Sequence, residues 1–358
     1  MRSKIWEKIG QRPPRSRLNK KIKVGKMKIF LLSNQPERTT RLQMFKASLQ
    51  RLGYEVIVPR FSTRNWLYIA KETRRLLQQD RPDVVHLFNV PDVIYHGLGK
   101  LKGAYFKKLI YDYRSPWGVE LQMTLGPAAR PIGEHFEKEL VGAADTITAV
   151  NRPLADKLRS YPQAKGKPLF IVNNYPARSF LENSSKLSEL DLPQEEALIF
   201  IGRISRQEGI GNLRHLIRKV PEENFWIIGD GPLSRWYLRD LPENARFFGW
   251  QPHEKVAGLI SRAKICLIPH NESLLTPYAT DKAVWKLNEY LLLGKIVVAS
   301  GVTQEEKRKN LVVVKSSELE SSVRENLHRK PEKMNAADYR FWETNDPIIQ
   351  KAYESLKL

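Results

Sequence analysis

The chain has 358 residues, of which 41% are hydrophobic, and this length predicts two domains with separate cores. Its one cysteine, Cys266, lies in an apolar run, which excludes an internal disulfide and a cysteine-based zinc site. No apolar stretch approaches the roughly 18 residues that span a bilayer, and the basic N-terminus lacks the apolar core of a signal peptide. We therefore expect a cytoplasmic protein, soluble or peripheral on the inner face of the membrane.

The net charge of +21 is the unusual property of this composition, and residues 1–26 alone hold ten Lys or Arg residues against one acidic residue. Such an excess favours an anionic partner: nucleic acid, an anionic membrane surface or a phosphorylated substrate. The alternative is a solvated tail without a partner. Because no known nucleic-acid-binding motif is present, we expect no nucleic-acid partner, and we interpret residues 1–26 as a contact for an anionic membrane.

Residues 27–181 are predicted to form the N-terminal domain. The first strand is expected at residues 28–32, and the apolar residues after it recur at helical spacing up to Gly53, where a helix C-cap belongs. A second helix is marked by apolar residues between Trp66 and Leu77. The other strands of this domain are predicted at residues 54–58, 83–88, 108–113, 146–150 and 169–172. This alternation predicts a parallel sheet covered by helices.

Residues 182–194 are polar and weakly patterned, which predicts a linker before a second domain at residues 195–335. Its strands are predicted at residues 197–201, 225–228, 245–248, 265–269, 296–299 and 311–314. Glycine directly follows the first three of them, as Gly202, Gly229 and Gly249. In open α/β sheets a ligand lies beyond the carboxyl ends of the strands, where glycine lets backbone amides approach a phosphate. The pattern predicts a doubly wound α/β domain with a nucleotide crevice.

Four segments of this second domain carry a family resemblance. They are Ile201-Gly202-Arg203-Ile204, Ile228-Gly229-Asp230-Gly231-Pro232, Phe248-Gly249-Trp250 and residues 286–299. Their order and spacing resemble those of retaining GT-B glycosyltransferases, of the family 4-like branch that builds capsular polysaccharides and glycolipids. The resemblance is looser over residues 27–180. It implies two Rossmann-like domains facing a cleft, and a final helix within residues 336–358 that opens at Tyr339 and crosses back, anchored by Phe341 and Trp342.

In that family a carboxylate, seven further residues and a glutamate mark the donor site, and here the pair is Asp281 and Glu289. The resemblance implies that Asp281 orients the sugar hydroxyls and that Glu289 binds the ribose. The spacing places Asp281 just ahead of a predicted helix at residues 282–293, with Glu289 on the same face. A desolvated Glu289 needs hydrogen-bond donors, which two ribose hydroxyls supply. The alternative is that Glu289 is a surface residue and Asp281 an N-cap.

Arg203 follows a strand and a glycine, and its planar guanidinium suits the donor pyrophosphate. The catalytic residues are therefore expected to be Asp281, Glu289 and Arg203. The residues expected to bind the nucleotide sugar are Gly202, Arg203, Arg206, Gly229, Gly231, Trp250, Lys282, Lys286 and Glu289. One position departs from the family, because Glu208 stands where a lysine is usual and brings an anion near the leaving phosphate. Either Arg206 or Gln207 compensates, or the loop points elsewhere.

The acceptor side is expected in the N-terminal domain. The segment Tyr113-Arg114-Ser115-Pro116-Trp117 follows a predicted strand and resembles an Arg-Asp-Leu-Trp-Pro segment of polysaccharide transferases. The residues predicted to line this side are Ser33, Asn34, Arg114 and Trp117. For Trp117 the alternative is structural packing. His86 lies within an aliphatic strand and is interpreted as a core residue.

The resemblance implies transfer of a sugar, with retention, from a UDP- or GDP-type nucleotide sugar to a glycan, lipid-linked or other hydroxyl acceptor. The departing phosphate would itself assist deprotonation of the acceptor. The sequence has no Asp-x-Asp motif and no cluster of metal ligands, so we expect neither metal nor cofactor. Two alternatives stay open: a GT-B nucleotide-sugar epimerase, and a catalytically inactive relic that binds nucleotide sugar.

Overall fold

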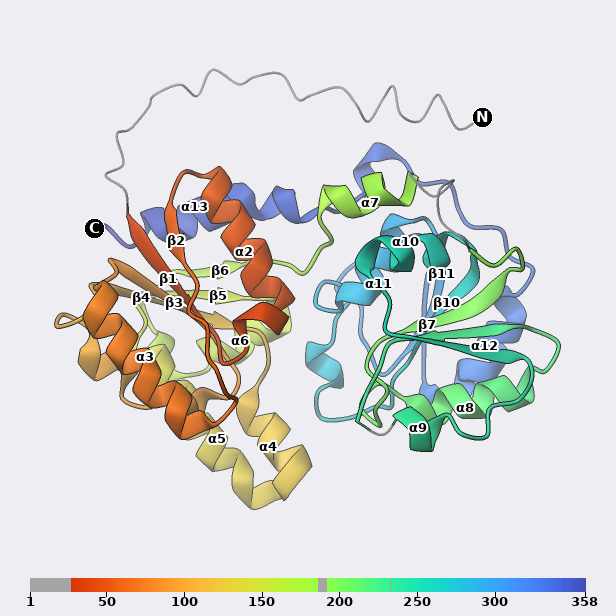
Figure 1. Ribbon diagram of the computed structural model, residues 1–358, viewed down its shortest axis with the longest axis horizontal. Coiled ribbons are helices and arrows are strands. Elements are labelled where there is room, and N and C mark those ends of the chain that lie inside the picture. Colours follow the sequence, from red (N-terminus) through yellow and green to blue (C-terminus); the bar gives the residue numbers. More distant parts are fainter. Residues whose placement is uncertain (1–26, 186–191, 233) are drawn as a thin grey trace.

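The computed structural model describes residues 27–185, 192–232 and 234–358, which form two α/β domains side by side (Figure 1). The predicted membrane contact at residues 1–26 lies outside the described residues. Within them, no helix combines the length and the apolar character needed to cross a bilayer.

The first domain is built on six parallel strands in the order β2-β1-β3-β4-β5-β6. The strands are β1 (Lys28–Leu32), β2 (Glu55–Ile57), β3 (Val84–Phe88), β4 (Lys108–Tyr113), β5 (Thr146–Ala149) and β6 (Leu169–Ile171). The helices are α2 (Thr40–Arg51), α3 (Trp66–Asp80), α4 (Trp117–Leu125), α5 (Arg130–Ala143) and α6 (Arg152–Arg159). Every residue of β3 is buried, as expected for a central strand that helices cover on both faces.

The second domain repeats this plan with the strand order β12-β11-β10-β7-β8-β9. Its strands are β7 (Ala197–Ile201), β8 (Phe225–Ile228), β9 (Ala245–Gly249), β10 (Ala263–Pro269), β11 (Ile296–Ser300) and β12 (Leu311–Val314). Its helices are α8 (Ile210–Lys219), α9 (Ser234–Tyr237), α10 (His253–Ser261), α11 (Trp285–Leu292) and α12 (Leu319–Asn326). All the strands predicted from the sequence are present, so the predicted fold class is confirmed.

Helix α2 shows how local sequence positions the first domain's cavity wall. Its apolar residues Leu42, Phe45 and Leu49 are fully buried against the sheet, which fixes the helix axis. The chain then turns at Gly53, whose φ of +88° suits glycine, and enters β2. The amino end of α2 is thereby held at the carboxyl end of β1.

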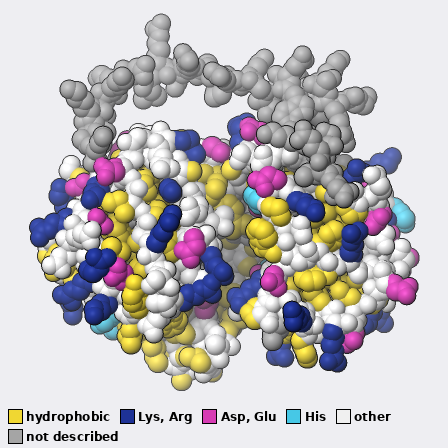
Figure 2. Space-filling view, in the orientation of Figure 1, with side chains coloured by type: hydrophobic (Ala, Val, Ile, Leu, Met, Phe, Trp, Pro, Cys, Tyr) yellow, Lys and Arg dark blue, Asp and Glu magenta, His cyan; other side chains and the backbone are white. Residues whose placement is uncertain are grey.

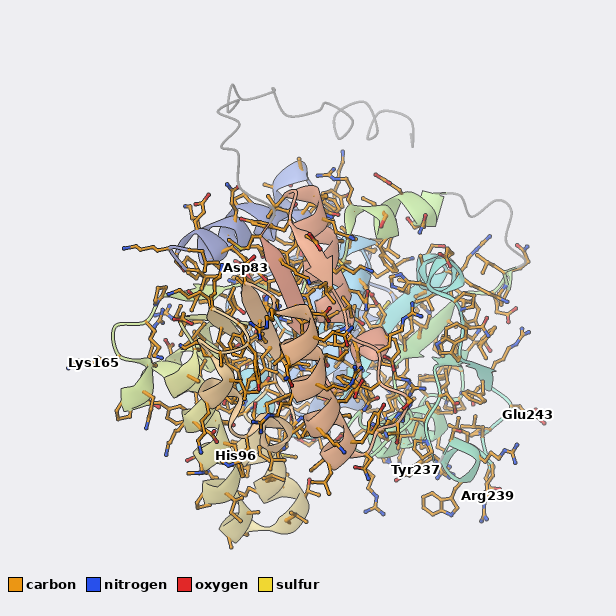
Figure 3. All side chains as sticks on the ribbon, turned by 60° about the vertical axis from the view of Figure 1, so that its left-hand side comes forward. Asp83, His96, Lys165, Tyr237, Arg239 and Glu243 are labelled. Atoms are coloured by element: carbon orange, nitrogen blue, oxygen red, sulfur yellow. The ribbon has the colours of Figure 1, made fainter. Side chains whose placement is uncertain are left out.

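The amino ends and the carboxyl ends of the strands in the first sheet differ in their contacts. Asp83, just before β3, accepts from the Lys28 amide at 2.9 Å and from Lys107 Nζ at 2.7 Å. The hydrogen bond from Lys107 lowers the pKa of Asp83, so this carboxylate stays charged and fastens the amino edge. Figure 3 shows Asp83 at the upper part of the domain and His96, which follows the carboxyl end of β3, at the lower part. The carboxyl edge is left for a site.

The chain crosses between the domains twice. The first crossing follows β6 and leads into α7 (Arg178–Ser185), which extends into the predicted linker. The second returns to α13 (Asp346–Glu354), which packs on α2, β5 and β6. The crossings are joined, because Asn345 Nδ2 donates to the Asn173 carbonyl at 3.0 Å and the Trp342 amide to the Pro176 carbonyl at 2.9 Å.

The expectation that the last helix opens at Tyr339 is wrong, since α13 begins at Asp346. Trp342 is fully buried in the first domain, where its indole nitrogen donates to Ser48 Oγ at 2.8 Å. Phe341 instead belongs to the core of the second domain. Neighbouring aromatic side chains thus anchor opposite domains.

Candidate functional site

A cavity of about 670 Å³ lies between the two domains, and we call it the interdomain cavity. Segments beyond the carboxyl ends of β1 and β4 supply Asn34, Arg38 and Arg114 to its wall, Val90 follows β3, and helix α4 supplies Glu120. Arg203 and Trp285 face it from the second domain. Figure 2 shows Lys and Arg side chains on both sides of the hollow between the domains. The volume is that of a pocket for a small organic molecule.

Two of the predicted acceptor-side residues, Asn34 and Arg114, line this cavity. The other two are corrected. Ser33 is fully buried and lies 2.9 Å from Thr39 Oγ1, so its hydroxyl is used inside the domain. Trp117 is also buried and packs on Phe136, with ring centroids 5.8 Å apart, which is the structural role considered as its alternative.

Arg114 is held rigidly in the interdomain cavity. Its amide donates to Asn89 Oδ1 at 2.9 Å, and its guanidinium donates to the carbonyls of Asn89 and Val90. Asn89 also donates to the Ser115 carbonyl at 2.7 Å and so locks the loop beyond β4. Burial lowers the pKa of Arg114, but from so high an ordinary value that the group remains a cation.

Beneath the cavity, Arg41 forms a buried ion pair with Asp112, through distances of 2.7 and 2.8 Å. Burial alone would raise the pKa of Asp112, yet the charge of Arg41 holds it below its ordinary value. Arg41 also donates to Asn174 Oδ1 at 2.9 Å, which ties this wall to the first crossing. His86 contacts the Tyr353 hydroxyl at 2.7 Å, and burial lowers its pKa to about 3, so it is a neutral core residue as interpreted.

Three glycines end the neighbouring strands β7, β8 and β9 of the second sheet. The Gly202 amide donates to the Ile228 carbonyl at 3.0 Å, and the Gly229 amide to the Gly249 carbonyl at 2.8 Å. These two amides are used within the sheet, which corrects the expectation that they approach a phosphate. Glycine is needed for close packing instead. A Cβ on Gly229 would lie 1.9 Å from the carbonyl oxygen of Gly202, and a Cβ on Gly231 would lie 2.3 Å from the carbonyl oxygen of Ile204.

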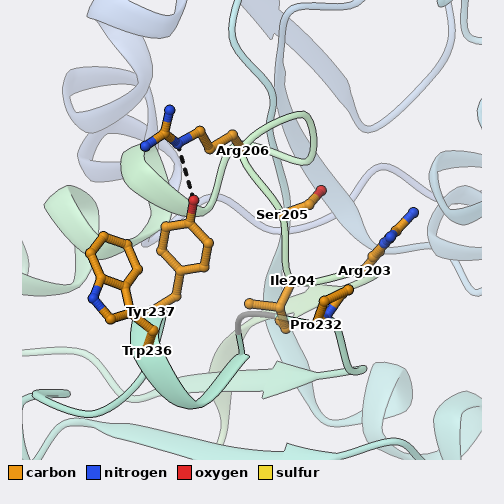
Figure 4. A pocket seen from close by; sticks show the side chains of 7 residues that line it. All are labelled: Arg203, Ile204, Ser205, Arg206, Pro232, Trp236 and Tyr237. Carbon is orange, nitrogen blue, oxygen red and sulfur yellow. Dashed lines mark hydrogen bonds between the residues drawn. The ribbon is translucent and has the colours of Figure 1, made fainter. Parts of the chain in front are cut away.

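Arg203 lines the interdomain cavity and also a second cavity of about 500 Å³ inside the second domain. Trp236 and Tyr237 of α9 form much of the second cavity, and Arg206 Nε donates to the Tyr237 hydroxyl at 3.1 Å. The Arg203 side chain points away from them (Figure 4). It forms no hydrogen bond or ion pair with any residue that the structure describes. Arg203 is therefore an exposed, unpartnered cation between two cavities.

Glu208 pairs with Lys286 and also lies 3.2 Å from His270 Nε2. Burial tends to raise the pKa of Glu208, but the charge of Lys286 and the hydrogen bond with His270 hold it well below its ordinary value. A Cβ on Gly202 would lie 3.1 Å from both Glu208 Oε2 and Lys286 Nζ, so the pair sits directly beneath the turn that carries Arg203. The compensating cation is thus Lys286, which the sequence did not connect with Glu208.

Glu289 lies on α11 with its side chain 15% exposed, and its carboxylate is 3.1 Å from His253 Nε2 at the start of α10. The hydrogen bond with Glu289 raises the pKa of His253. Trp250, just before α10, is 73% exposed. Glu289 is in the wall of neither cavity described above, so its contact with ribose stays a prediction.

The predicted position of Asp281 is corrected. Helix α11 begins at Trp285 rather than at residue 282, so Asp281 and Glu289 do not share a helix face. Asp281 is fully buried, accepts from the Glu305 amide at 2.6 Å and lies 3.7 Å from Arg308. Burial raises its pKa. Its carboxyl group holds a loop inside the domain and is not available to a sugar in this structure.

Lys282, predicted to bind the nucleotide, is 3.5 Å from Glu306, and its carbonyl accepts from the Asn174 amide at 2.9 Å. Asn288 explains why α11 begins late, because its side chain donates to the carbonyls of Asp281 and Asn174. These bonds stabilise the non-helical turn before α11 and attach it to the first crossing. Within the described residues, no group of His, Cys, Asp or Glu could hold a metal ion.

Sequence reasoning missed several residues of the interdomain cavity. Arg38 and Glu120 were not singled out, and neither was the side chain of Trp285, a residue of the opposite wall. The available signal was position: Arg38 lies in the loop after the first predicted strand, and Glu120 shortly after the segment that contains Arg114. Loops at the carboxyl ends of parallel strands meet at one edge, so their polar residues are candidates together.

No family model and no curated protein sequence matches this chain. Among solved structures, sucrose-phosphate synthase from Thermosynechococcus elongatus is similar, with a TM-score of 0.62 and 15% identity over 92% of this chain and 96% of that one. HepE from Anabaena, solved with UDP and glucose, has a TM-score of 0.61 and 14% identity over 92% and 99%. A UDP-GlcNAc 2-epimerase from Methanocaldococcus jannaschii has a TM-score of 0.54 and 10% identity over 91% and 99%. The chain therefore has the GT-B fold.

Proposed function

We propose that this protein is a glycosyltransferase that takes a sugar from a UDP- or GDP-type nucleotide sugar. The observation that carries the proposal is Arg203, an exposed cation without a described partner, on a glycine turn between the two cavities. A guanidinium in this position suits the diphosphate of a donor, with the sugar directed into the interdomain cavity. Transferases and epimerases among the similar structures share this fold, and HepE was solved with UDP.

In the proposed reaction the second domain stabilises the departing diphosphate. Arg203 binds the phosphate oxygens, and the ion pair between Glu208 and Lys286 lies directly beneath the same turn. Glu289 accepts hydrogen bonds from the ribose hydroxyls. Asp281 acts as a structural residue that holds the loop before α11, in place of the catalytic role first expected.

The first domain binds the acceptor in this proposal. Asn34, Arg114 and Glu120 present amide, guanidinium and carboxyl groups to the interdomain cavity, which are suitable partners for a hydroxyl-bearing acceptor. Retention of the anomeric configuration and independence from metal are parts of the same proposal. Product stereochemistry by proton NMR tests the first, and transfer in the presence of a chelator tests the second.

The direct test is a thermal-shift panel of UDP, GDP and their sugars, followed by a transfer assay with each ligand that binds. A ligand at 100 times its dissociation constant adds about 2.7 kcal/mol to the free energy of unfolding, which is readily detected. We expect one nucleotide class to stabilise the wild type clearly more than Arg203→Gln. Arg218→Gln on the exposed face of α8 is the matched control. If no nucleotide or nucleotide sugar shifts the transition, the donor site is refuted.

An epimerase is the second candidate, favoured by the similarity to the UDP-GlcNAc 2-epimerase. Such an enzyme alters the sugar of the donor when no acceptor is present. Incubation with a bound nucleotide sugar alone separates the two activities: a new sugar epimer assigns an epimerase, and an unchanged donor favours the transferase.

We further propose that the protein works at an anionic membrane surface on the cytoplasmic side, through residues 1–26. Their ten basic residues would each contribute about 1 kcal/mol close to such a surface. We expect salt-sensitive binding to vesicles that contain phosphatidylglycerol, and loss of this binding when residues 1–26 are deleted. Equal binding by the shortened protein would refute the role of this segment.

A further inference from the structure

The first domain's wall of the interdomain cavity carries more positive charge than the proposed donor requires. Arg38, Arg41 and Arg114 line it from this side, and Glu120 is the one acidic residue among the described residues of the wall. The donor diphosphate is assigned to Arg203 in the opposite wall. The arginines of the first domain therefore need an explanation of their own.

Arg41 is explained by the fold. Its guanidinium makes two hydrogen bonds with Asp112, both side chains are buried, and Arg41 also bonds the Val172 carbonyl at 2.6 Å. Its charge is neutralised by a carboxylate, and its donors are occupied. Arg41 thus supports the cavity and is not available for a ligand.

Arg38 and Arg114 are different. Arg38 is exposed at the end of a short 3₁₀ turn (Pro36–Arg38), and its side chain has no partner among the residues that the structure describes. The Arg114 guanidinium donates to the carbonyl groups of Asn89 and Val90, and the carboxylates of Asp112 and Glu120 attract it without forming an ion pair with it. Two guanidinium groups therefore reach the same cavity wall without forming an ion pair.

Glu120 does not cancel them. Its Oε1 accepts a hydrogen bond from Ser115 Oγ, and its burial raises its pKa, which reduces the fraction of the charged form. One carboxyl group stands against Arg38, Arg114 and Arg203. Desolvating cations without counter-charge is unfavourable, so a neutral acceptor would leave this wall poorly matched, whereas an anionic one would complete it.

We propose that the acceptor carries a phosphate monoester, which Arg38 and Arg114 bind in the interdomain cavity. The planar fork of a guanidinium matches phosphate oxygens, and a dianion with three terminal oxygens can engage two such groups at once. The cavity, at about 670 Å³, has room for an organic group beside the phosphate, and Trp285 lines the opposite wall. Calling this ligand the acceptor rests on the proposed transfer reaction, but binding of the phosphate group can be tested without it.

The first arm of the test measures binding of glucose 6-phosphate, glucose and glucuronate by calorimetry, with UDP present and the ionic strength kept at about 0.15 M. We expect Arg38→Gln to weaken glucose 6-phosphate binding tenfold to a hundredfold, as for loss of a charge-assisted hydrogen bond. Arg64→Gln is the matched control, because Arg64 is an exposed arginine of the same domain outside the cavity wall. It should leave binding within about twofold of the wild type.

The second arm distinguishes a soluble phosphate ester from a phosphate on a lipid. It measures binding to phosphatidylcholine vesicles with and without phosphatidic acid, again comparing Arg38→Gln with Arg64→Gln, which both keep residues 1–26. Dependence on Arg38 in either arm supports the proposal and identifies the source. The proposal is overturned if Arg38→Gln matches the control in both arms, or if glucuronate binds as tightly as glucose 6-phosphate.

The same measurements separate this inference from the proposed donor site. Arg203→Gln should weaken UDP binding and leave glucose 6-phosphate binding largely intact. If UDP does not bind the wild type while Arg38-dependent phosphate binding persists, the transferase proposal fails and the anion site stands. If UDP binds while neither glucose 6-phosphate nor phosphatidic acid vesicles show Arg38-dependent binding, the donor site stands and this inference fails.

Discussion

On each side of the interdomain cavity, one cation is paired with a carboxylate and another is not. In the first domain, Arg41 is neutralised by Asp112 deep in the core, while the Arg38 side chain has no partner within residues 27–185, 192–232 and 234–358. In the second domain, Lys286 is paired with Glu208 beneath a turn, while Arg203 has no partner in the same part of the chain. Each side thus has one cation held in an ion pair and one arginine that is available to bind a ligand. The fixed pair shapes the loop, and the unpartnered arginine is the candidate binding group.

The strongest test of the second domain is Glu289→Gln, a residue outside both cavity walls. The change keeps the shape of the side chain and replaces the charged carboxylate that we expect to accept hydrogen bonds from the ribose hydroxyls. Transfer should therefore fall by about a hundredfold. The unfolding midpoint should change little, because this carboxylate has a single described partner, the largely exposed His253. Initial rates and thermal melts measure both, with the exposed Glu325→Gln as control. Normal turnover would exclude Glu289 from the site.

Arg203→Gln should have the next largest effect and tests whether the unpartnered cation of the second wall binds the donor. Loss of one guanidinium from a diphosphate should weaken nucleotide binding about tenfold. Titration of UDP or GDP measures it, and Arg218→Gln should be unchanged. Equal affinities for the two variants would mean that Arg203 does not contact the donor, and the parallel between the walls would be lost.

Glu208→Gln tests the fixed pair of the second wall and should act in the opposite direction. Removal of the anion frees Lys286 for the donor, so nucleotide affinity should rise about threefold to tenfold, while the unfolding midpoint falls because a half-buried ion pair is broken. Glu223→Gln, which breaks the pair with Lys264 on the same domain, should lower stability alone. Weaker nucleotide binding by Glu208→Gln would show that Glu208 positions Lys286 for the donor.

The smallest effect concerns the pH dependence of stability at His253. Its pKa is raised by Glu289, so the pair stabilises the fold fully below the ordinary histidine pKa, and this contribution is lost as the pH rises through the raised pKa. The gain is small because the imidazole is 60% exposed. Melts of wild type and His253→Gln between pH 5 and pH 9 should converge at the alkaline end. Curves that differ by a constant amount would contradict this.

The sequence predicted the sheets, and the position of Arg203 at the end of a strand, because the relevant signals are local. Each strand is an apolar run followed by turn residues, and Arg203 directly follows a strand and a glycine. The glycines at the strand ends were also recognised from the local sequence. The expectation that their amides face a ligand was wrong for Gly202 and Gly229, because both donate hydrogen bonds within the sheet.

What could not be predicted is charge pairing between distant segments. Arg41 and Asp112 are 71 residues apart, and Glu208 and Lys286 are 78 apart, so no spacing rule connects them. Asp281 was misplaced for a related reason. Its neighbours suggested a helix from residue 282, but the Asn288 side chain holds a turn against the first crossing, and tertiary bonds overrode the local pattern.

The joined crossings near Asn173 and Asn345 have a mechanical consequence. Because the two segments that link the domains are hydrogen-bonded to each other, we expect them to act as one hinge. The domains would then rotate about this hinge rather than slide past one another. A swing changes a single angle, and that angle sets the gap between the wall with Arg38 and the wall with Arg203. A ligand that contacts both arginines would therefore favour one angle between the domains over the others.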